Sequence, residues 1–146
     1  MGLWEISFRT QYDYPFIEMS GRHPGIPISM WCIWGRELLQ VPTQDEHELA
    51  SIEKDIRRAG RVIDKWIEAQ EARIFMLRCT CDVLRNSPWN VWEPHECVDA
   101  PPAVFQDGWG YFRVLSFEEE NTRGLFRDLN KLGPTELIRK REIPLS

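Results

Sequence analysis

The feature that most restricts the fold of this chain is an order of elements that occurs twice. Each half contains a strand, a long loop, a second strand, a helix with an acidic start, a glycine and a final strand. Trp34-Gly35 has a counterpart in Trp109-Gly110. One constant spacing relates the helix residues Ile52, Ile56 and Gly60 to Leu125, Leu129 and Gly133. This shared order and register predict a duplicated domain, with halves of about 1–70 and 71–146.

Hydrophobic periodicity then assigns the elements. Alternating or apolar runs predict strands over 3–10, 28–34, 38–41, 61–67, 73–81, 109–117 and 135–141. Thr43 and Glu46 form a capping-box pattern for a helix that ends before Gly60, and a second helix is expected over 118–132. Residues 11–27 and 82–108 are expected to be irregular. These elements predict an α+β fold of duplicated ferredoxin-like or ACT-like units, with a mainly antiparallel sheet and two helices on one face.

Length and charge exclude several classes of protein. The 146 residues suit one domain, and the net charge of −5 disfavours a stand-alone nucleic-acid binder, which needs a basic face. No apolar run approaches the roughly 18–20 residues of a membrane span. The start of the chain lacks the pattern of a signal peptide. We therefore expect a cytoplasmic protein with reduced cysteines and no membrane partner.

A cluster of sulfur and imidazole side chains is the sharpest candidate site. Cys79 and Cys81 share one face of the strand predicted over 73–81, and His95 and Cys97 follow in the next loop. Two thiolates, an imidazole and a third thiolate suit zinc or another transition metal. Two alternatives are a redox-sensing thiol pair and buried cysteines that act as small hydrophobic residues.

Seven tryptophans in a chain of this length suggest a ligand cavity or an interface. The predicted ligand-binding residues are Trp4, Trp31, Cys32, Trp34 and Trp109, and the alternative for them is core packing. Trp89 and Trp92 lie in the long second loop, where they form either a lid over the sheet or a docking surface.

The remaining charged motifs have structural explanations. Asp45-Glu46 and Glu118 to Glu120 lie where helix N-termini favour negative charge. Arg139-Lys140-Arg141 suits a solvated strand edge. No catalytic triad, phosphate loop or metalloprotease motif occurs, so we expect a protein that is not an enzyme.

Two groups of residues carry a family resemblance. The first group is Tyr14-Pro15-Phe16, Ser20, Pro24 and Met30-Trp31-Cys32. The second group is Pro101-Pro102, Asp107-Gly108-Trp109, Tyr111 to Phe117, Glu118-Glu119, Leu125-Phe126, Leu129, Gly133, Glu136-Leu137 and Arg141-Glu142-Ile143. Together they resemble the amino-terminal domain of archaeal transcription regulators of the bacterioopsin-activator type. Tyr14 and Gly110 depart from that family's usual cysteine and glutamate.

The resemblance implies a sensory or dimerising domain that controls transcription. In that family a helix-turn-helix follows the position of Ile143, so we expect the DNA-binding part to be absent from these residues. We predict the signal-input domain of a transcription regulator, which responds to a ligand, a metal or a redox event and forms a dimer. Two alternatives stay open: a small thiol-dependent enzyme that uses Cys32 or Cys97 with His95, and a protein-docking module without a small ligand.

Overall fold

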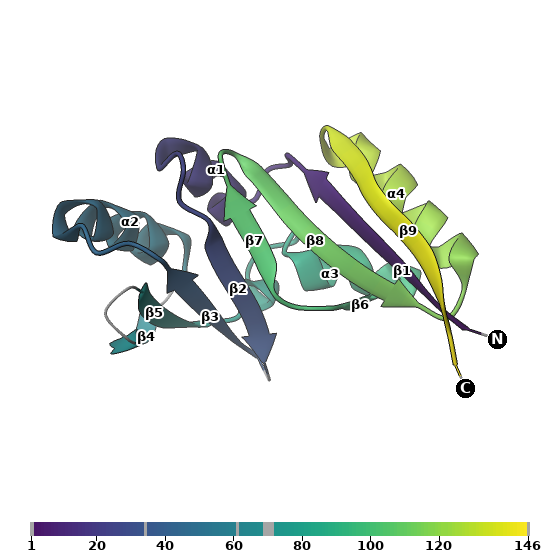
Figure 1. Ribbon diagram of the computed structural model, residues 1–146, viewed down its shortest axis with the longest axis horizontal. Helices are drawn as coiled ribbons and strands as arrows, with labels where there is room; N and C mark the ends of the chain where they lie inside the picture. The colour runs from purple at the N-terminus through teal and green to yellow at the C-terminus, as the bar shows by residue number, and fades with distance from the viewer. Residues whose placement is uncertain (1, 34, 61, 69–71, 146) are drawn as a thin grey trace.

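The computed structural model describes residues 2–33, 35–60, 62–68 and 72–145, with the backbone alone for 62–68. This part of the chain forms one nine-stranded sheet and four α-helices (Figure 1). The strands are β1 (Gly2–Thr10), β2 (Ile28–Ile33), β3 (Arg36–Val41), β4 (Val62–Glu68), β5 (Ala72–Arg78), β6 (Val98–Asp99), β7 (Ala103–Gln106), β8 (Trp109–Ser116) and β9 (Thr135–Pro144). The helices are α1 (Pro15–Arg22), α2 (Glu46–Ala59), α3 (Pro88–Trp92) and α4 (Glu119–Leu132), with 3₁₀ turns η1 (Thr80–Asp82) and η2 (Glu93–His95).

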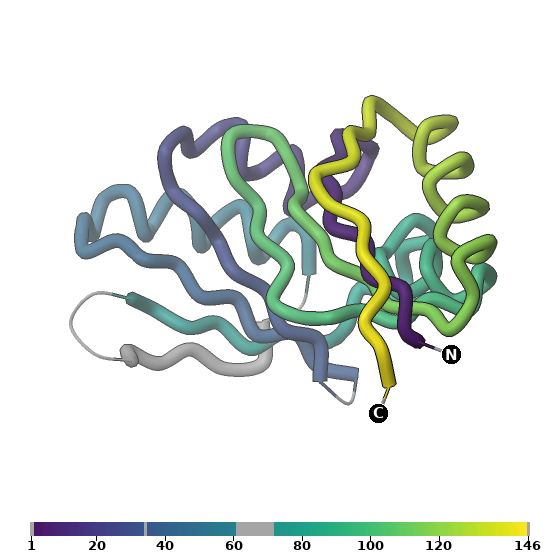
Figure 2. Tube along the Cα trace, turned by 45° about the vertical axis from the view of Figure 1, so that its right-hand side comes forward, coloured from purple at the N-terminus to yellow at the C-terminus, as the bar shows by residue number. Residues whose placement is uncertain are grey.

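Every strand pair in the described sheet is antiparallel. The strand order is β4-β5-β3-β2-β7-β8-β1-β9, and β6 pairs with β8 beyond the end of β7. The first strand, β1, lies between β8 and β9, whereas β5 lies between β3 and β4. Gly2 is therefore opposite Pro144, and the two termini lie side by side at one edge (Figures 1 and 2). The predicted mixture of helices and antiparallel sheet is confirmed.

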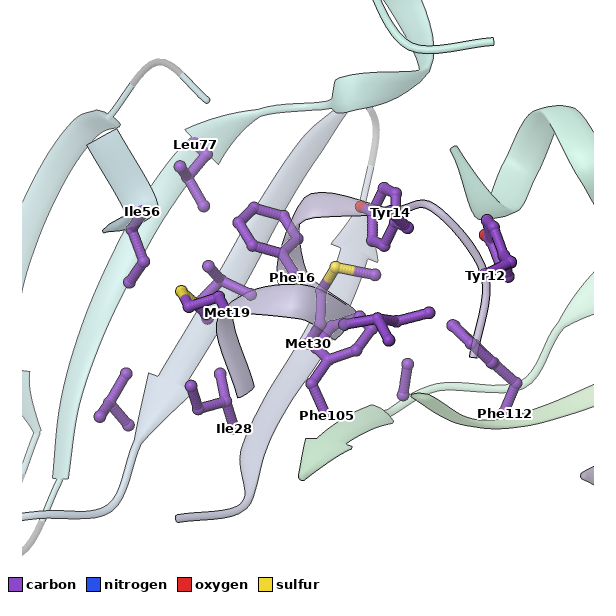
Figure 3. Close-up of a cluster of buried hydrophobic side chains, with 14 of the residues drawn as sticks. Tyr12, Tyr14, Phe16, Met19, Ile28, Met30, Ile56, Leu77, Phe105 and Phe112 are labelled. Carbon is purple, nitrogen blue, oxygen red and sulfur yellow. The ribbon is translucent and has the colours of Figure 1, made fainter. Parts of the chain in front are cut away.

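One face of the sheet carries the core. The register pairs Phe8 with Phe112 and Leu39 with both Met30 and Phe75, so these buried side chains share a face. Side chains from all four helices join the same buried cluster or pack against it: Phe16 from α1, Ile52 and Ile56 from α2, Trp92 from α3, and Leu125, Leu129 and Phe126 from α4. Figure 3 shows part of this cluster around Phe16, Met19 and Phe105. Burial of this apolar area is the main stabilising contribution of the fold.

Two helices correct the prediction that residues 11–27 and 82–108 are irregular. Helix α1 begins with Pro15 at its first turn and buries Phe16, Ile17 and Met19. Helix α3 also begins with a proline, Pro88, and buries Trp92. Proline is compatible with the first turn of a helix because its missing N–H group has no partner there in any case. Pro15 and Pro88 therefore begin helices instead of marking loops. The prediction of two helices is wrong, because the described residues form four.

The end of one strand and the start of one helix also correct the prediction. Strand β5 ends at Arg78, after which the Cys79 N–H group donates to the Gly35 carbonyl and a 3₁₀ turn begins. Cys79 and Cys81 therefore do not share a strand face. The N-cap of α2 is Asp45, whose carboxylate accepts from the N–H groups of His47 and Glu48, and not Thr43.

The glycines that were predicted to end the two long helices do so. Gly60 and Gly133 donate their N–H groups to Ile56 and Leu129. A Cβ atom at Gly133 would overlap the Gln11 carbonyl oxygen, whereas a Cβ at Gly60 would meet only the Leu77 side chain. None of the helices in the described segments has the length and apolar character of a membrane span.

Candidate functional site

A pocket of about 540 Å³ opens on the helix-covered side of the sheet, between the end of the β2–β3 hairpin and α3. Its apolar lining comprises Met30, Pro88, Trp89, Trp92, Val98 and Pro101. Its polar lining comprises Cys32, Glu37, Cys79, Cys81, Ser87 and Asp99. This volume is within the usual range for small-molecule sites, and an apolar lining with a few converging polar groups is typical of them.

Glu37 is the buried acid of this pocket. Its side chain is 1% exposed because β3 directs it to the covered face, in phase with Leu39 and Val41. The Oε1 atom accepts from Thr80 N at 3.2 Å, from Thr80 Oγ1 at 3.0 Å and from Cys79 Sγ at 3.6 Å. The Oε2 atom is buried and has no hydrogen-bond partner in the described structure. Burial raises the pKa of Glu37, and the hydrogen bonds from Thr80 and Cys79 oppose that shift.

A hydroxyl network holds the Oε1 side of Glu37 in place. The Thr80 hydroxyl lies 3.0 Å from Tyr14 Oη and 2.8 Å from Ser87 Oγ. Because Thr80 has one hydroxyl proton and donates it to Glu37, it must accept from Tyr14 and Ser87. This network fixes the orientation of the carboxylate and leaves Oε2 as its unused acceptor.

Three of the four free thiols line the pocket. Cys32 Sγ and Cys79 Sγ are 3.6 Å apart. The contact with the Cys79 thiol lowers the pKa of the exposed Cys32, although partial burial opposes it. The pKa of Cys79 is raised by its contact with Cys32 and by burial. Burial and the neighbouring Cys79 raise the pKa of Cys81 to about 12. Cys32 is therefore the thiol of this pocket that ionises most readily.

Asp99 places a second carboxylate at the pocket. Burial raises its pKa to about 6, and Trp92 and the Arg113 guanidinium oppose that shift. The Trp92 N–H group is near this carboxylate but forms no hydrogen bond of normal geometry. Among the described residues that line the pocket, two are acidic and none is basic. The pocket therefore favours a cationic group over an anionic one.

The sequence model of the family described as "HVO_A0563, N-terminal" matches residues 5–146. The chain belongs to this family. No curated protein is significantly similar to it in sequence.

The structure does not bring together the four predicted metal ligands. Cys79 and Cys81 line the pocket, but His95 and Cys97 do not. His95 Nε2 is 2.8 Å from Asp128 Oδ2, and the Cys97 thiol donates to the backbone carbonyl of His95 rather than to its ring. Burial raises the pKa of Cys97 to about 11. The described residues contain no group of three or more His, Cys, Asp and Glu side chains positioned to hold a metal ion.

Of the predicted ligand-binding residues, Cys32 lines the pocket and Trp34 lies outside the described residues. Trp4, Trp31 and Trp109 do not line it. The ring centre of Trp4 lies 5.6 Å from Lys140 Nζ. The Arg9 guanidinium lies 3.9 Å from the ring centre of Trp109. The tryptophans in the described pocket lining are Trp89 and Trp92 of α3. Trp92 is fully buried against Phe8 and Phe112, whereas Trp89 is 44% exposed.

Sequence reasoning missed both carboxylates of the site. It left Glu37 outside the strand predicted over 38–41, but the register continues through Arg36 and Glu37, which pair with Ile33 and Cys32. An available signal was the alternation of Glu37 with Leu39 and Val41, which puts an acid on a buried face. Asp99 lies in a two-residue strand, which is too short to produce a periodic signal.

Proposed function

We propose that this family member is the signal-input and dimerisation domain of a transcription regulator of the bacterioopsin-activator type. The pocket is its site for a small-molecule signal. The observation that carries this proposal is the combination of an apolar pocket with the unpartnered, buried Oε2 atom of Glu37. A buried polar atom without a partner costs stability, and a binding site is a common reason for keeping one.

The wall of the pocket comes from both halves of the chain. Met30 and Glu37 belong to the β2–β3 hairpin, whereas Trp92 and Asp99 belong to α3 and β6. An occupant that contacts all four residues favours the packing in which they converge. This provides a physical route by which a bound ligand changes how the halves are held together.

Three observations support the duplicated ferredoxin-like or ACT-like arrangement within this proposal. If β1, β2, β3 and β4 correspond to β5, β7, β8 and β9, the strand order reads the same from either edge, and the first strand of each half lies in the other half's sheet. Both short helices begin with proline. In both halves a histidine after the short helix bonds an aspartate of the long helix, His23 with Asp55 and His95 with Asp128.

The C-terminal strand β9 is the proposed output. It forms one edge of the sheet and carries Leu137 and Ile138 with about half of each residue exposed. Lys140 and Arg141 bind Glu119 and Glu5, so two charges of the basic tripeptide are held within the domain. A dimer through this edge would bring two copies of the C-terminal end together, which suits regulators that bind paired DNA sites.

A fusion assay tests both parts of the proposal. Residues 1–146 are joined to a repressor DNA-binding domain that binds its operator only as a dimer, and repression of a reporter gene is measured. We expect repression, and we expect small molecules that bind the pocket to change it. In a control fusion, Val98→Trp fills the pocket mouth and should retain repression but lose the response. A fusion that does not repress contradicts dimerisation. A response that Val98→Trp leaves intact contradicts the pocket as the signal site.

A thiol-dependent enzyme is the second candidate, and the lowered pKa of Cys32 favours it. A nucleophile also needs a base or an orienting group within hydrogen-bond reach. The described neighbour of Cys32 Sγ is the thiol of Cys79. The geometry therefore favours a binding pocket, and we propose a non-catalytic role for this domain.

A further inference from the structure

We propose that the pocket beside α3 recognises an organic monocation with an apolar body, and that Glu37 Oε2 accepts a hydrogen bond from its ammonium or guanidinium group. This inference rests on the function proposed above, because it names the chemical class of the pocket's ligand. It rests on three observations: Glu37 Oε2 has no partner, the described lining holds carboxylates without a basic residue, and the same lining includes two tryptophans.

The two oxygens of Glu37 are used differently. Oε1 receives every hydrogen bond that the described structure gives this carboxylate, from two groups of Thr80 and from the Cys79 thiol. Oε2 is buried to the same degree and receives none. A carboxylate that is only structural would be expected to use both oxygens, because burying an unpaired acceptor lowers stability. Because Glu37 lines the pocket, a donor that enters the pocket is a candidate partner for this free oxygen.

The charges of the lining indicate the sign of that donor's charge. Glu37 and Asp99 are the ionisable carboxylates of the described lining, and no lysine, arginine or histidine accompanies them. Three thiols also line the pocket, and the raised pKa values of Cys79 and Cys81 keep those two neutral. A neutral ligand would leave the buried acid without compensation, and an anion would be repelled by it.

The apolar part of the pocket lining indicates what kind of body the ligand has. Trp89, Trp92 and Met30 supply aromatic and thioether surface, and aromatic faces attract organic cations. Hydrated inorganic cations gain little from such a surface, whereas a hydrocarbon group attached to the cation would cover it. The combination selects an organic cation with a hydrocarbon or aromatic body, such as an arylalkyl amine.

A pair of probes that differ only in the polar group tests this proposal. The probes are 4-phenylbutylammonium and 4-phenylbutanol, titrated into the intact chain by isothermal calorimetry. Both carry the same hydrocarbon body and a hydrogen-bond donor, but only the first is charged. We expect the ammonium to bind about tenfold or more tightly, because a charge-assisted hydrogen bond is roughly twice as strong as a neutral one.

Glu37→Gln is the decisive variant. It keeps an acceptor for Thr80 at the Oε1 position and removes the charge, so the preference for the ammonium should disappear while binding of the alcohol is retained. Glu18→Gln, an exposed acid on α1, is the matched control and should change neither affinity. Val98→Trp should weaken both probes at the mouth of the pocket without touching the buried acid. It also keeps the proposal testable if the Glu37 variant does not fold.

The outcomes separate this inference from the function on which it rests. Equal binding of the two probes, both weakened by Val98→Trp, would overturn cation recognition and leave the pocket as a ligand site. A preference for the ammonium that survives Glu37→Gln would also overturn the role of Glu37. If Val98→Trp changes neither affinity, or neither probe binds, both the cation site and the pocket-based signal function are contradicted.

Discussion

The molecule has two places where a short helix meets the turn of a β-hairpin, and they differ in packing. Helix α1 meets the β7–β8 turn, where a Cβ at Gly21 would lie 3.5 Å from Gly108 Cα. Ser20 Oγ accepts from Gly108 N at 3.0 Å, and Asp107 Oδ1 accepts from Gly25 N at 2.8 Å. Helix α3 meets the β2–β3 hairpin at a pocket of about 540 Å³.

This difference follows from the side chains at the two places. Glycines on α1 and on the turn allow their backbones to approach closely, and the left-handed φ of 84° at Gly108 suits glycine. The other place carries Trp89, Trp92, Cys32 and Glu37, which surround a space rather than filling it. A short helix against a hairpin thus yields a closed structural contact at one place and a candidate binding site at the other. The following predictions test contrasts of this kind between pairs of similar features.

The largest expected effect concerns the helix-ending glycines. Gly133→Ala should lower the free energy of unfolding by about 3 kcal/mol or more, because its Cβ would overlap the Gln11 backbone carbonyl, which cannot easily move. Gly60→Ala should cost less than about 1 kcal/mol, because its Cβ meets the movable end of Leu77 at 3.2 Å. Urea unfolding of both variants measures the difference. Equal losses would show that the halves tolerate a methyl group alike.

The next effect concerns the two histidine–aspartate pairs. His23 Nε2 lies 2.7 Å from Asp55 Oδ2, and the two side chains are 8% and 10% exposed. The side chain of Asp128, which lies beside His95, is 48% exposed. Asp55→Asn should cost about 1–2 kcal/mol of unfolding free energy, and Asp128→Asn should cost clearly less.

The stability difference between wild type and Asp55→Asn should depend on pH. Burial alone would raise the pKa of Asp55, but hydrogen bonds from His23 and Arg22 outweigh it and lower the pKa in the folded chain. Its stabilising contribution is therefore present above the pKa of the unfolded chain and is lost as pH falls through the folded value. The gap between wild type and Asp55→Asn should narrow in acid. A gap that widens in acid would contradict this assignment.

Asp99 should show the opposite pH dependence. Its pKa of about 6 in the folded chain exceeds the value of about 4 in an unfolded chain. The folded chain binds more protons between these values, so this residue lowers stability as pH rises. Asp99→Asn should therefore stabilise the protein by about 1–2 kcal/mol near pH 8 and make little difference near pH 4. Thermal unfolding across this pH range measures it, and a difference independent of pH would contradict a raised pKa.

The smallest expected effect is on thiol reactivity. In the native protein, iodoacetamide should label Cys32 before the other cysteines, because Cys32 is exposed and has the lowered pKa. Cys79→Ala removes the neighbouring thiol that lowers the pKa of Cys32 and should slow labelling of Cys32 roughly threefold or more. Peptide mass spectrometry after timed quenching gives both rates. Earlier labelling of Cys97, which is buried with a pKa of about 11, would contradict this order.

The sequence predicted the long periodic elements well. Strands β1, β8 and β9 and helices α2 and α4 each span enough residues to repeat a pattern, so local periodicity identified them. It failed for α1 and α3, which have eight and five residues. Their prolines resembled loop signals because a proline at a helix start and one in a turn look alike without the contacts that follow. The N-cap of α2 was predicted at Thr43 instead of Asp45, because both residue types can cap a helix and the sequence alone does not show which one does.

The candidate site was only partly predictable. Cys32, Cys79 and Cys81 were identified by residue type, but their partners come from segments distant in the chain, Glu37 in β3 and Asp99 in β6. His95 and Cys97 were grouped with the thiols because they are near them in sequence. The structure places His95 against Asp128 of α4 instead. Spacing along a strand predicts a shared face only while the strand lasts, and β5 ends before Cys79.

By itself, the sequence determined the mixed α and β composition, the two glycine-ended helices and the alternation that gives the sheet a buried face. These depend on periodicity and capping, which act between residues close in the chain. Tertiary structure alone decided that β1 lies between β8 and β9, that Oε2 of Glu37 has no partner and that three thiols meet at one pocket. Those outcomes depend on which distant segments pack together, because burial and hydrogen-bond satisfaction are settled only when the whole sheet has formed.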